Sequence, residues 1–353
     1  MPPFLIPPEH APRLFREVQV VPEEARSILR HQKDDRYGWG YSLNPYRGCS
    51  YGCKYCYVRG YPAPIPNTGS ATERPRLREA SDWGGWVTPK LNAPELLWAQ
   101  RHRLHNESVF ISSATDPYQP IEKDFRLTRK CLQVLLACPT TRVIIHTRSP
   151  MILQDLELLR AFGSRLSIGF SIPTDDDYVR QILEPEAPPI PARWAAVERL
   201  ARAGLRVGIS AAPLLAVHDM TTFANKVRDS GARSAWAGGL RLLKDDPFYG
   251  VLSEHQWLRI LDPDHVREMR QALKEALGDR SPGHHRRQLV PEPVWANSSA
   301  TRRPIQGPSS HRVSAHRQFK PGSSGCHPSR SGLPVHRPSS QDAYQPGLFE
   351  EAS

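Results

Sequence analysis

Residues 44–57 read Asn-Pro-Tyr-Arg-Gly-Cys-Ser-Tyr-Gly-Cys-Lys-Tyr-Cys-Tyr, and this stretch decides how the rest of the chain is interpreted. It places Cys49, Cys53 and Cys56 at C-x3-C-x2-C spacing. Thiolates are soft ligands that suit iron–sulfur clusters and zinc. Gly48 and Gly52 allow the tight backbone that three converging sulfur atoms require. We therefore expect one metal centre on this loop.

The number of cysteines limits the kind of centre. No fourth cysteine follows the loop, since the next one is Cys131. A closed structural zinc site takes four protein ligands, and an electron-transfer cubane usually takes four thiolates. Three thiolates leave one iron of a 4Fe–4S cluster open for an outside ligand. The alternative is a zinc knuckle with a histidine as fourth ligand, but the closest histidines are His31 and His102.

The cysteine spacing resembles that of the radical SAM superfamily, and so does the aromatic Tyr55 just before the last cysteine. This resemblance implies a 4Fe–4S cluster on Cys49, Cys53 and Cys56. It also implies that the open iron binds the amino and carboxylate groups of S-adenosylmethionine (SAM). An electron from the cluster then cleaves SAM to methionine and a 5′-deoxyadenosyl radical. A reductant such as flavodoxin or ferredoxin is the partner that this chemistry requires.

Composition indicates the cell compartment and the class of partner. The 353-residue chain carries a formal net charge of +11, which favours an anionic partner, nucleic acid above all. Six cysteines in a chain of this length do not form a secreted disulfide framework. The start of the chain lacks a signal-peptide pattern, and no stretch approaches the roughly 20 apolar residues of a membrane helix. We therefore expect a cytoplasmic protein without a membrane partner.

Composition also divides the chain into three parts. Residues 1–36 are interpreted as a Pro-rich, loosely packed N-terminal arm, and residues 37–279 as the core domain. Residues 281–353 contain 10 prolines, 13 serines and 6 histidines. Such a segment buries too little apolar surface to offset its conformational entropy. We therefore expect a disordered basic tail over residues 280–353.

The core shows a repeating strand–helix rhythm. Short apolar runs predict strands at residues 37–43, 108–113, 142–147, 166–172, 205–210 and 234–242. Amphipathic runs with proline near the start and glycine after the end predict helices at residues 94–105, 127–138, 149–163, 192–203, 221–230 and 263–277. This alternation predicts an α/β fold with a parallel sheet. A partial (β/α)6 barrel, as in the radical SAM superfamily, suits it, and a doubly wound open sheet is the competitor.

Ligands of parallel β/α folds bind at the carboxyl ends of the strands. The second, third and fourth predicted strands end near Thr115 and Asp116, near Arg148, and at Ser171. SAM offers a sulfonium cation, a carboxylate, an amine and two ribose hydroxyls. Acidic, hydroxyl and guanidinium side chains are the complement of these groups. Asp116 before Pro117 also fits an ordinary turn at a strand end.

Further segments narrow the resemblance to a subfamily. Residues 44–49, 90–97, 115–120, 127–129 and 184–185 are similar to radical SAM proteins related to spore photoproduct lyase, often labelled DNA repair photolyases. The similarity covers roughly residues 41–242. It implies that Tyr55, Thr115, Arg148 and Ser171 help to hold SAM. Arg148 stands where relatives typically have lysine, so it keeps the charge but not the donor geometry.

One departure from the subfamily concerns the reaction. The lyase itself returns a hydrogen atom to its product from a cysteine near the end of the second strand, where this chain has Ser112, Ser113 and Ala114. We therefore expect a reaction other than the repair of thymine dimers, with damaged or modified nucleic acid as the leading substrate. The alternatives are a protein or small-molecule substrate, and a zinc-stabilised nucleic-acid-binding module without catalysis.

Four other residues have structural interpretations. Cys131 and Cys138 lie on the apolar face of a predicted helix and are expected in the core. Glu184 and Arg193 are expected to brace each other after the fourth strand.

Overall fold

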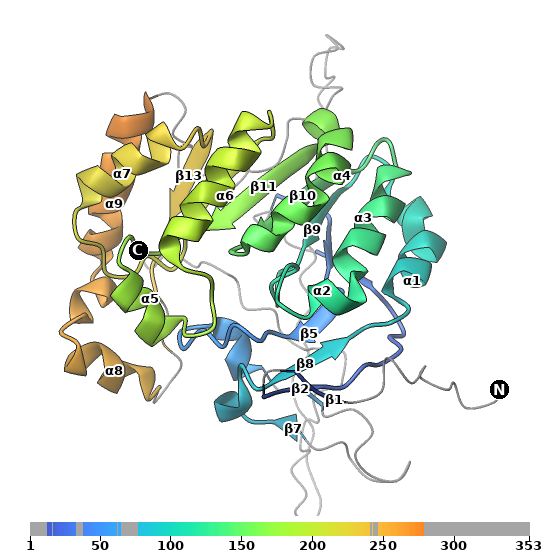
Figure 1. The fold of residues 1–353 in the computed structure, drawn as a ribbon, viewed down its shortest axis with the longest axis horizontal. Coiled ribbons are helices and arrows are strands. Elements are labelled where there is room, and N and C mark those ends of the chain that lie inside the picture. Colours follow the sequence, from blue (N-terminus) through green and yellow to red (C-terminus); the bar gives the residue numbers. More distant parts are fainter. Residues whose placement is uncertain are drawn as a thin grey trace, which may run out of the picture. The chain divides into compact units, whose positions relative to one another are not determined.

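The computed structural model describes residues 13–15, 17–32, 38–61, 63–64, 77–240, 242 and 246–278. A central sheet has the strand order β13-β12-β11-β10-β9-β4-β3 (Figure 1). All neighbouring pairs in it are parallel except β3 with β4. The strands are β3 (Leu29–His31), β4 (Tyr41–Leu43), β9 (Ser108–Ile111), β10 (Arg142–Thr147), β11 (Leu166–Ser171), β12 (Val207–Ala211) and β13 (Ser234–Ala237).

Helical segments lie between the six parallel strands: α1 (Ala93–Gln100) with η5 (Arg101–Leu104), α2 (Glu122–Phe125), α3 (Leu127–Leu136), η6 (Pro150–Asp155) with α4 (Leu156–Ala161) and η7 (Gly163–Arg165), α5 (Asp177–Leu183), α6 (Ile190–Arg202) and α7 (Met220–Asp229). Three more follow the last strand: α8 (Phe248–Glu254), η8 (Leu258–Leu261) and α9 (Pro263–Leu277). From β4 to β13 the spatial order of the parallel strands is their chain order. A doubly wound sheet reverses its order at a switch point. The competing expectation is therefore wrong, and the partial (β/α)6 barrel is confirmed.

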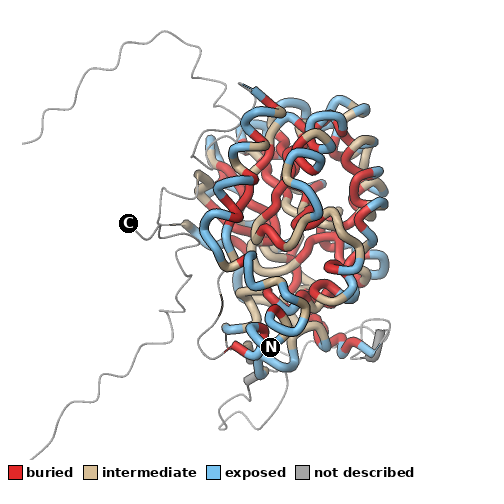
Figure 2. The backbone as a smooth tube through the Cα atoms, turned by 90° about the vertical axis from the view of Figure 1, so that its left-hand side faces the viewer, coloured by how far each residue is buried: buried red, intermediate tan, exposed pale blue. Residues whose placement is uncertain are grey.

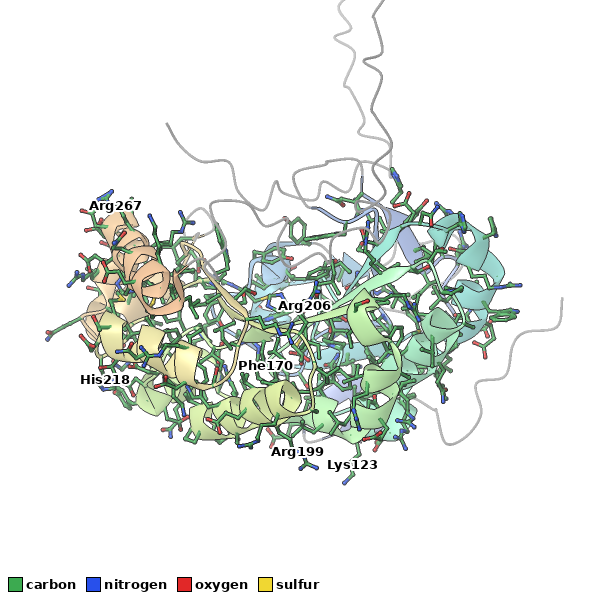
Figure 3. All side chains as sticks on the ribbon, turned by 90° about the horizontal axis from the view of Figure 1, so that it is seen from above. Lys123, Phe170, Arg199, Arg206, His218 and Arg267 are labelled. Carbon is green, nitrogen blue, oxygen red and sulfur yellow. The ribbon has the colours of Figure 1, made fainter. Side chains whose placement is uncertain are left out.

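The two faces of the sheet differ because side chains alternate along each strand. Val109, Val143, Ile168, Phe170 and Ile209 belong to the main apolar core and are almost fully buried. In Figure 1, α3, α4 and α6 cover one face of the sheet. Figure 2 shows buried residues in the interior, with exposed residues along the outside. Each such side chain contributes about 1.5–3 kcal/mol on burial. Figure 3 shows the converse, with Lys123, Arg199 and Arg267 at the outer surface.

Several predicted boundaries shift. The predicted helix at residues 149–163 begins as the 3-10 segment η6, and the α-helix starts only at Leu156. Ser149 does act as the predicted cap, accepting a hydrogen bond from Met151 N at 3.3 Å. Buried Asp155 ends the 3-10 segment, because it is fixed there by Tyr118 Oη at 3.1 Å and by an ion pair with Arg129. Tertiary contacts of this kind are invisible to local periodicity.

The N-terminal arm is packed more tightly than expected. The expectation of a loose lead-in is wrong for residues 17–32, which contribute β2 (Val18–Val20) and β3. Val18 and Val20 are buried and Gln19 is exposed, an alternation that indicated a strand. A second sheet has the order β1-β2-β8-β5, and a two-stranded ladder joins β6 to β7. These strands are β1 (Arg13–Phe15), β5 (Tyr46–Gly48), β6 (Ala63–Pro64), β7 (Leu77–Arg78) and β8 (Trp86–Pro89), with η3 (Tyr57–Gly60) and η4 (Ala80–Asp82) between them.

The sequence predicted a disordered tail and no membrane-spanning helix. The predicted disordered tail over residues 280–353 lies outside the described residues. By its internal contacts the chain divides into units of residues 1–298 and 299–353. Within the described ranges, no helix is both long enough and apolar enough to span a membrane.

A buried carboxylate joins the second sheet to the helical layer. Tyr46 Oη of β5 donates a hydrogen bond to Glu122. Glu122 also accepts hydrogen bonds from Thr128 N and Arg129 N, both at 3.1 Å, and so caps the first turn of α3. Burial nevertheless raises the pKa of Glu122 to about 7.

The raised pKa of Glu122 predicts a pH-dependent stability. Because the folded-state pKa is about 7 and the ordinary value is 4.5, the protonated form stabilises the fold below pH 4.5. That stability is lost as the pH rises through 7, by roughly 3 kcal/mol for the ionised group. Glu122→Gln lacks this titration. Anaerobic denaturant unfolding at several values between pH 5 and pH 8 should show wild type losing stability relative to the variant. A difference that is constant across this range would contradict the prediction.

Candidate functional site

The cysteine loop follows β5 and lies against the carboxyl ends of the parallel strands. Cys49 and Cys53 are buried, Cys56 is half-buried, and none of the three forms a disulfide. The loop belongs to a separate apolar cluster with parts of α5, α8 and η8. This cluster contains Tyr51, Tyr55, Val179, Leu183, Ala187, Leu215, Phe248, Leu252 and Ile260. The three thiols are thus enclosed on one side by apolar side chains.

Glycines set the path of this loop. Gly48 and Gly52 have φ values of +76° and +56°, in the region that side chains disfavour. A Cβ atom on Gly48 would lie 2.5 Å from the carbonyl oxygen of Trp86. Gly52 packs against the backbone of Gly84, where an added Cβ would lie 2.8 Å from Gly52 Cα. The tight backbone that the sequence predicted is present, and the Gly84 contact adds a partner that it did not indicate.

Residues after β9 hold the loop in place. Thr115 Oγ1 donates a hydrogen bond to the Gly48 carbonyl at 2.5 Å. Gln119 accepts a hydrogen bond from Ser50 N at 3.0 Å and donates to Thr115 Oγ1 at 3.0 Å. Gln119 is fully buried, and its place in the 115–120 segment did not by itself indicate this role. The hydroxyl of Thr115 is therefore already engaged with the loop backbone.

Asp116 joins the ends of two strands. Its carboxylate accepts hydrogen bonds from Tyr118 N at 2.9 Å, Thr147 Oγ1 at 2.6 Å and Arg148 N at 2.9 Å. Burial raises the pKa of Asp116, and these donors partly oppose that effect. The structure therefore places Asp116 as a brace between β9 and β10. A contact between Asp116 and SAM stays a prediction.

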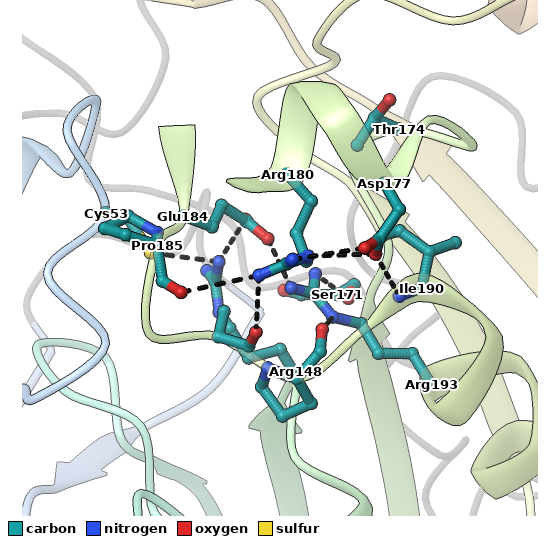
Figure 4. Close-up of polar contacts among 12 residues, drawn as sticks. Cys53, Arg148, Ser171, Thr174, Asp177, Arg180, Glu184, Pro185, Ile190 and Arg193 are labelled. Carbon is teal, nitrogen blue, oxygen red and sulfur yellow. Dashed lines mark hydrogen bonds and ion pairs between the residues drawn. The ribbon is translucent and has the colours of Figure 1, made fainter. Parts of the chain in front are cut away.

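Arg148 reaches the cysteine loop from the end of β10. Its Nη1 atom donates a hydrogen bond to Tyr55 Oη at 3.1 Å. The same atom donates to Cys53 Sγ at 3.1 Å and forms an ion pair with Glu184 (Figure 4). Burial opposes the guanidinium charge. The Cys53 thiol, Glu184 and Tyr55 outweigh burial and raise the pKa of Arg148 well above its usual value. Arg148 therefore stays a cation beside the predicted cluster ligand.

Glu184 is the carboxylate that pairs with the Arg148 guanidinium. The fully buried carboxylate pairs with both Arg148 and Arg193 and accepts a hydrogen bond from Tyr55 Oη. Burial alone would raise the pKa of Glu184, but the two guanidinium groups lower it below the usual value. The expected brace between Glu184 and Arg193 is confirmed. The sequence did not indicate that Arg148 joins it.

A second ion pair, between Arg180 and Asp177, fixes the segment that carries Glu184. Arg180 donates to Asp177 Oδ1 at 2.9 Å and to the Ala187 carbonyl at 3.1 Å. Asp177 in turn accepts a hydrogen bond from Ile190 N at 3.0 Å, at the start of α6. These contacts, shown in Figure 4, close residues 184–190 into a compact turn. Side-chain hydrogen bonds to the backbone thus position Glu184.

Ser171 lies on the other face of the sheet from the main core. Its Oγ lies 3.3 Å from His146 Nε2, and its carbonyl accepts a hydrogen bond from Arg193 Nη1 at 3.4 Å. His146 also contacts Phe110, with ring centroids 6.0 Å apart. Gly169 makes room, since a Cβ there would lie 3.1 Å from His146 Cδ2. His146 stands at the end of the third predicted strand, but the sequence did not indicate its contact with Ser171.

The thiols suit an iron–sulfur cluster by their chemistry. The pKa of Cys49, Cys53 and Cys56 is raised to about 12 in each case; burial is the largest cause, and a neighbouring thiol contributes to each rise. Binding of iron therefore requires the loss of protons from three clustered thiols. Within the described residues, no three His, Cys, Asp or Glu side chains converge on a point that could hold a single metal ion. A cubane takes each thiolate on a separate iron and does not need such convergence.

Comparison with known proteins identifies a family. The Radical SAM superfamily model matches residues 43–223, just over half of the chain. An uncharacterized protein of Methanocaldococcus jannaschii is 32% identical over 169 residues, which cover 48% of this chain and 58% of that protein. An uncharacterized protein of Acidianus two-tailed virus is 30% identical over 196 residues, with 54% of this chain and 58% of that protein covered. The chain thus spans under two thirds of the length of these relatives.

Solved structures show the same fold. Spore photoproduct lyase complexed with dinucleoside spore photoproduct matches with a TM-score of 0.54 at 14% identity, covering 74% of this chain and 80% of that one. The family match over residues 43–223 leads to one conclusion. This chain belongs to the radical SAM superfamily.

Proposed function

We propose that the protein binds one 4Fe–4S cluster through Cys49, Cys53 and Cys56 and uses it to cleave SAM. The observation that carries this proposal is a set of three thiols on one loop, two buried and one half-buried, with the loop fastened to the carboxyl ends of β9 and β10. When bound, a cluster with one open iron supplies the electron that converts SAM to methionine and a 5′-deoxyadenosyl radical. The electron comes from an outside reductant such as flavodoxin or ferredoxin.

The protein's own residues position the reactants. Thr115 and Gln119 fix the loop backbone, and Asp116 fixes the backbone of Arg148. Among the described residues, the polar partners of the Arg148 guanidinium all contact Nη1. Its Nη2 and Nε atoms are thus available to a SAM oxygen. We assign Tyr55, Thr115, Asp116, Arg148 and Ser171 to the SAM side of the cluster.

The apolar cluster around the loop keeps water away. Phe248, Leu252 and Ile260 are almost fully buried against the cysteine loop. A carbon radical abstracts hydrogen atoms from any nearby donor, so the enzyme must bring the substrate close and exclude competing reactions. The apolar cluster excludes water and competing hydrogen donors on one side of the loop.

The cluster assignment predicts a sharp difference between two buried cysteines. Cys53→Ala should abolish both the bound 4Fe–4S cluster and SAM cleavage, because one iron loses its thiolate. Cys131→Ala is the matched control, since Cys131 is equally buried but lies in α3, in the main core. The control should lose some stability and keep the cluster. Anaerobic reconstitution followed by iron, sulfide and zinc analysis checks both. A full cluster in Cys53→Ala, or stoichiometric zinc in wild type, would refute the assignment.

The SAM assignment predicts a graded effect at Arg148. Losing one donor to a buried ligand oxygen costs about 1–3 kcal/mol, which is roughly a five- to 150-fold loss of affinity. Arg148→Ala should therefore keep the cluster yet bind SAM much more weakly. Arg148→Lys, which restores the residue typical of relatives, should retain most of the binding. Anaerobic SAM titration of the three proteins tests this, and equal affinity in wild type and Arg148→Ala would place Arg148 outside the SAM site.

We propose damaged or modified nucleic acid as the substrate. Two observations support it: the fold is that of spore photoproduct lyase, and the chain carries a net charge of +11, of which residues 281–353 contribute +5. Ser112 and Ser113 follow β9. The resemblance to spore photoproduct lyase would place a hydrogen-donating cysteine at this point of the chain. The proposed reaction therefore begins with abstraction of a hydrogen atom from a nucleic-acid C–H bond and ends differently from thymine dimer repair.

The substrate proposal predicts that nucleic acid stimulates SAM cleavage. Reconstituted protein should release more 5′-deoxyadenosine with irradiated or modified DNA or RNA than alone, and binding should weaken as salt rises. Chromatography of the quenched reaction measures the nucleoside. Cys53→Ala serves as the blank. If nucleic acid neither binds nor stimulates the reaction, the substrate belongs to the alternative class, a protein or a small molecule.

A further inference from the structure

We propose that Arg148 acts on the cluster itself, by donating a charged hydrogen bond to the Cys53 thiolate and so raising the cluster's reduction potential. This inference rests on the proposed cluster, and it assigns to Arg148 a role separate from any contact with SAM. The central observation is the distance of 3.1 Å between Arg148 Nη1 and Cys53 Sγ. That contact comes from a side chain whose charge and position are both fixed.

The position of Arg148 is fixed from two directions. Its backbone nitrogen donates to buried Asp116 at 2.9 Å, which ties the end of β10 to the end of β9. Its guanidinium is held by Glu184, which is itself paired with Arg193. The side chains of Glu184 and Arg193 have no exposed surface, and that of Arg148 is 17% exposed. A donor held in this way keeps its direction toward the sulfur.

The net charge of this group favours the reduced cluster. Two guanidinium cations surround one carboxylate, so Arg148, Glu184 and Arg193 together carry one positive charge. Reduction by one electron from an outside reductant adds one negative charge to the iron–sulfur and thiolate unit. A positive hydrogen-bond donor on a ligating sulfur stabilises the more negative state, and this effect is strong in a buried, low-dielectric site. The protein should thus be easier to reduce with Arg148 than without it.

The alternative is that Arg148 only neutralises Glu184. Removing one partner of a buried ion pair leaves a buried charge and destabilises the fold. Such a structural role affects stability and cluster content, but it does not set the reduction potential of the cluster that remains. The potential is therefore the measurement that separates the two roles, and it needs neither SAM nor a substrate.

The experiment is a redox titration monitored by electron paramagnetic resonance, on anaerobically reconstituted full-length protein without SAM. Arg148→Gln keeps a donor but removes the charge, and should lower the midpoint potential. We expect at least a tenfold change in the reduction equilibrium, about 59 mV for one electron. Arg148→Lys keeps the charge on a side chain one bond shorter, and its potential should lie between those of Arg148→Gln and wild type.

Arg59→Gln is the matched control for charge alone. Arg59 follows the last cysteine, pairs with Asp246 and lies near enough to Cys56 to lower its pKa, against the larger rise from burial. No hydrogen bond joins Arg59 to a cysteine sulfur within the described residues. Arg59→Gln should therefore shift the potential less than Arg148→Gln does. Equal shifts in the two variants would overturn the proposal, since any nearby charge would then act alike.

Other outcomes are also decisive. An Arg148→Gln potential equal to that of wild type overturns the proposal. If Arg148→Gln holds no cluster, the comparison uses Arg148→Lys, and a wild-type potential there overturns it as well. If wild type itself binds no 4Fe–4S cluster, the proposed function fails along with this inference. An unshifted potential in a protein that does hold the cluster defeats this inference alone.

Discussion

The buried carboxylate of Glu184, held between Arg148 and Arg193, is the interaction on which the site depends. An ionised carboxylate without a partner is not stable in a protein interior, so both guanidinium groups must stay in place. They come from the end of β10 and from α6, and Glu184 itself follows α5. One charge balance therefore fixes three segments relative to one another. Its outer member, Arg148, is the one that contacts the cysteine loop.

The cysteine loop is positioned by backbone as much as by side chains. Gly52 and Gly84 approach closely: an added Cβ at Gly84 would lie 2.8 Å from Gly52 Cα, and one at Gly52 would lie 3.2 Å from Gly84 Cα. The side chains of Thr115 and Gln119 pair with two backbone groups of the loop, the Gly48 carbonyl and Ser50 N. Buried backbone groups need such partners, because an unpaired one costs as much as a lost hydrogen bond. The loop is thus held rigidly without any regular secondary structure of its own.

Several residues of the site serve positioning before they serve a ligand. The Asp116 carboxylate accepts hydrogen bonds from three donors at the strand ends, and the Thr115 hydroxyl donates one to the loop. The Arg148 guanidinium is charged and is held in one orientation. A radical enzyme needs residues fixed in this way, since a reactive intermediate must form at one place and in one orientation. The polar strand ends provide a frame for the loop, and SAM is the ligand that we propose for its open side.

The cysteine pattern, the α/β class and most of the elements could be predicted from the sequence, whereas the strand order, which excludes the doubly wound sheet, required the tertiary structure. Three cysteines at short spacing with glycines between them are a local pattern, and alternating strands and helices are a local rhythm, so both can be read without coordinates. The network of Arg148, Glu184 and Arg193, the buried role of Gln119 and the packing of residues 17–32 were decided only by the tertiary structure. Arg148 and Glu184 are 36 residues apart and Cys53 and Arg148 are 95 apart. Ion pairs and hydrogen bonds depend on distance in space, and periodicity along the chain carries no information about it.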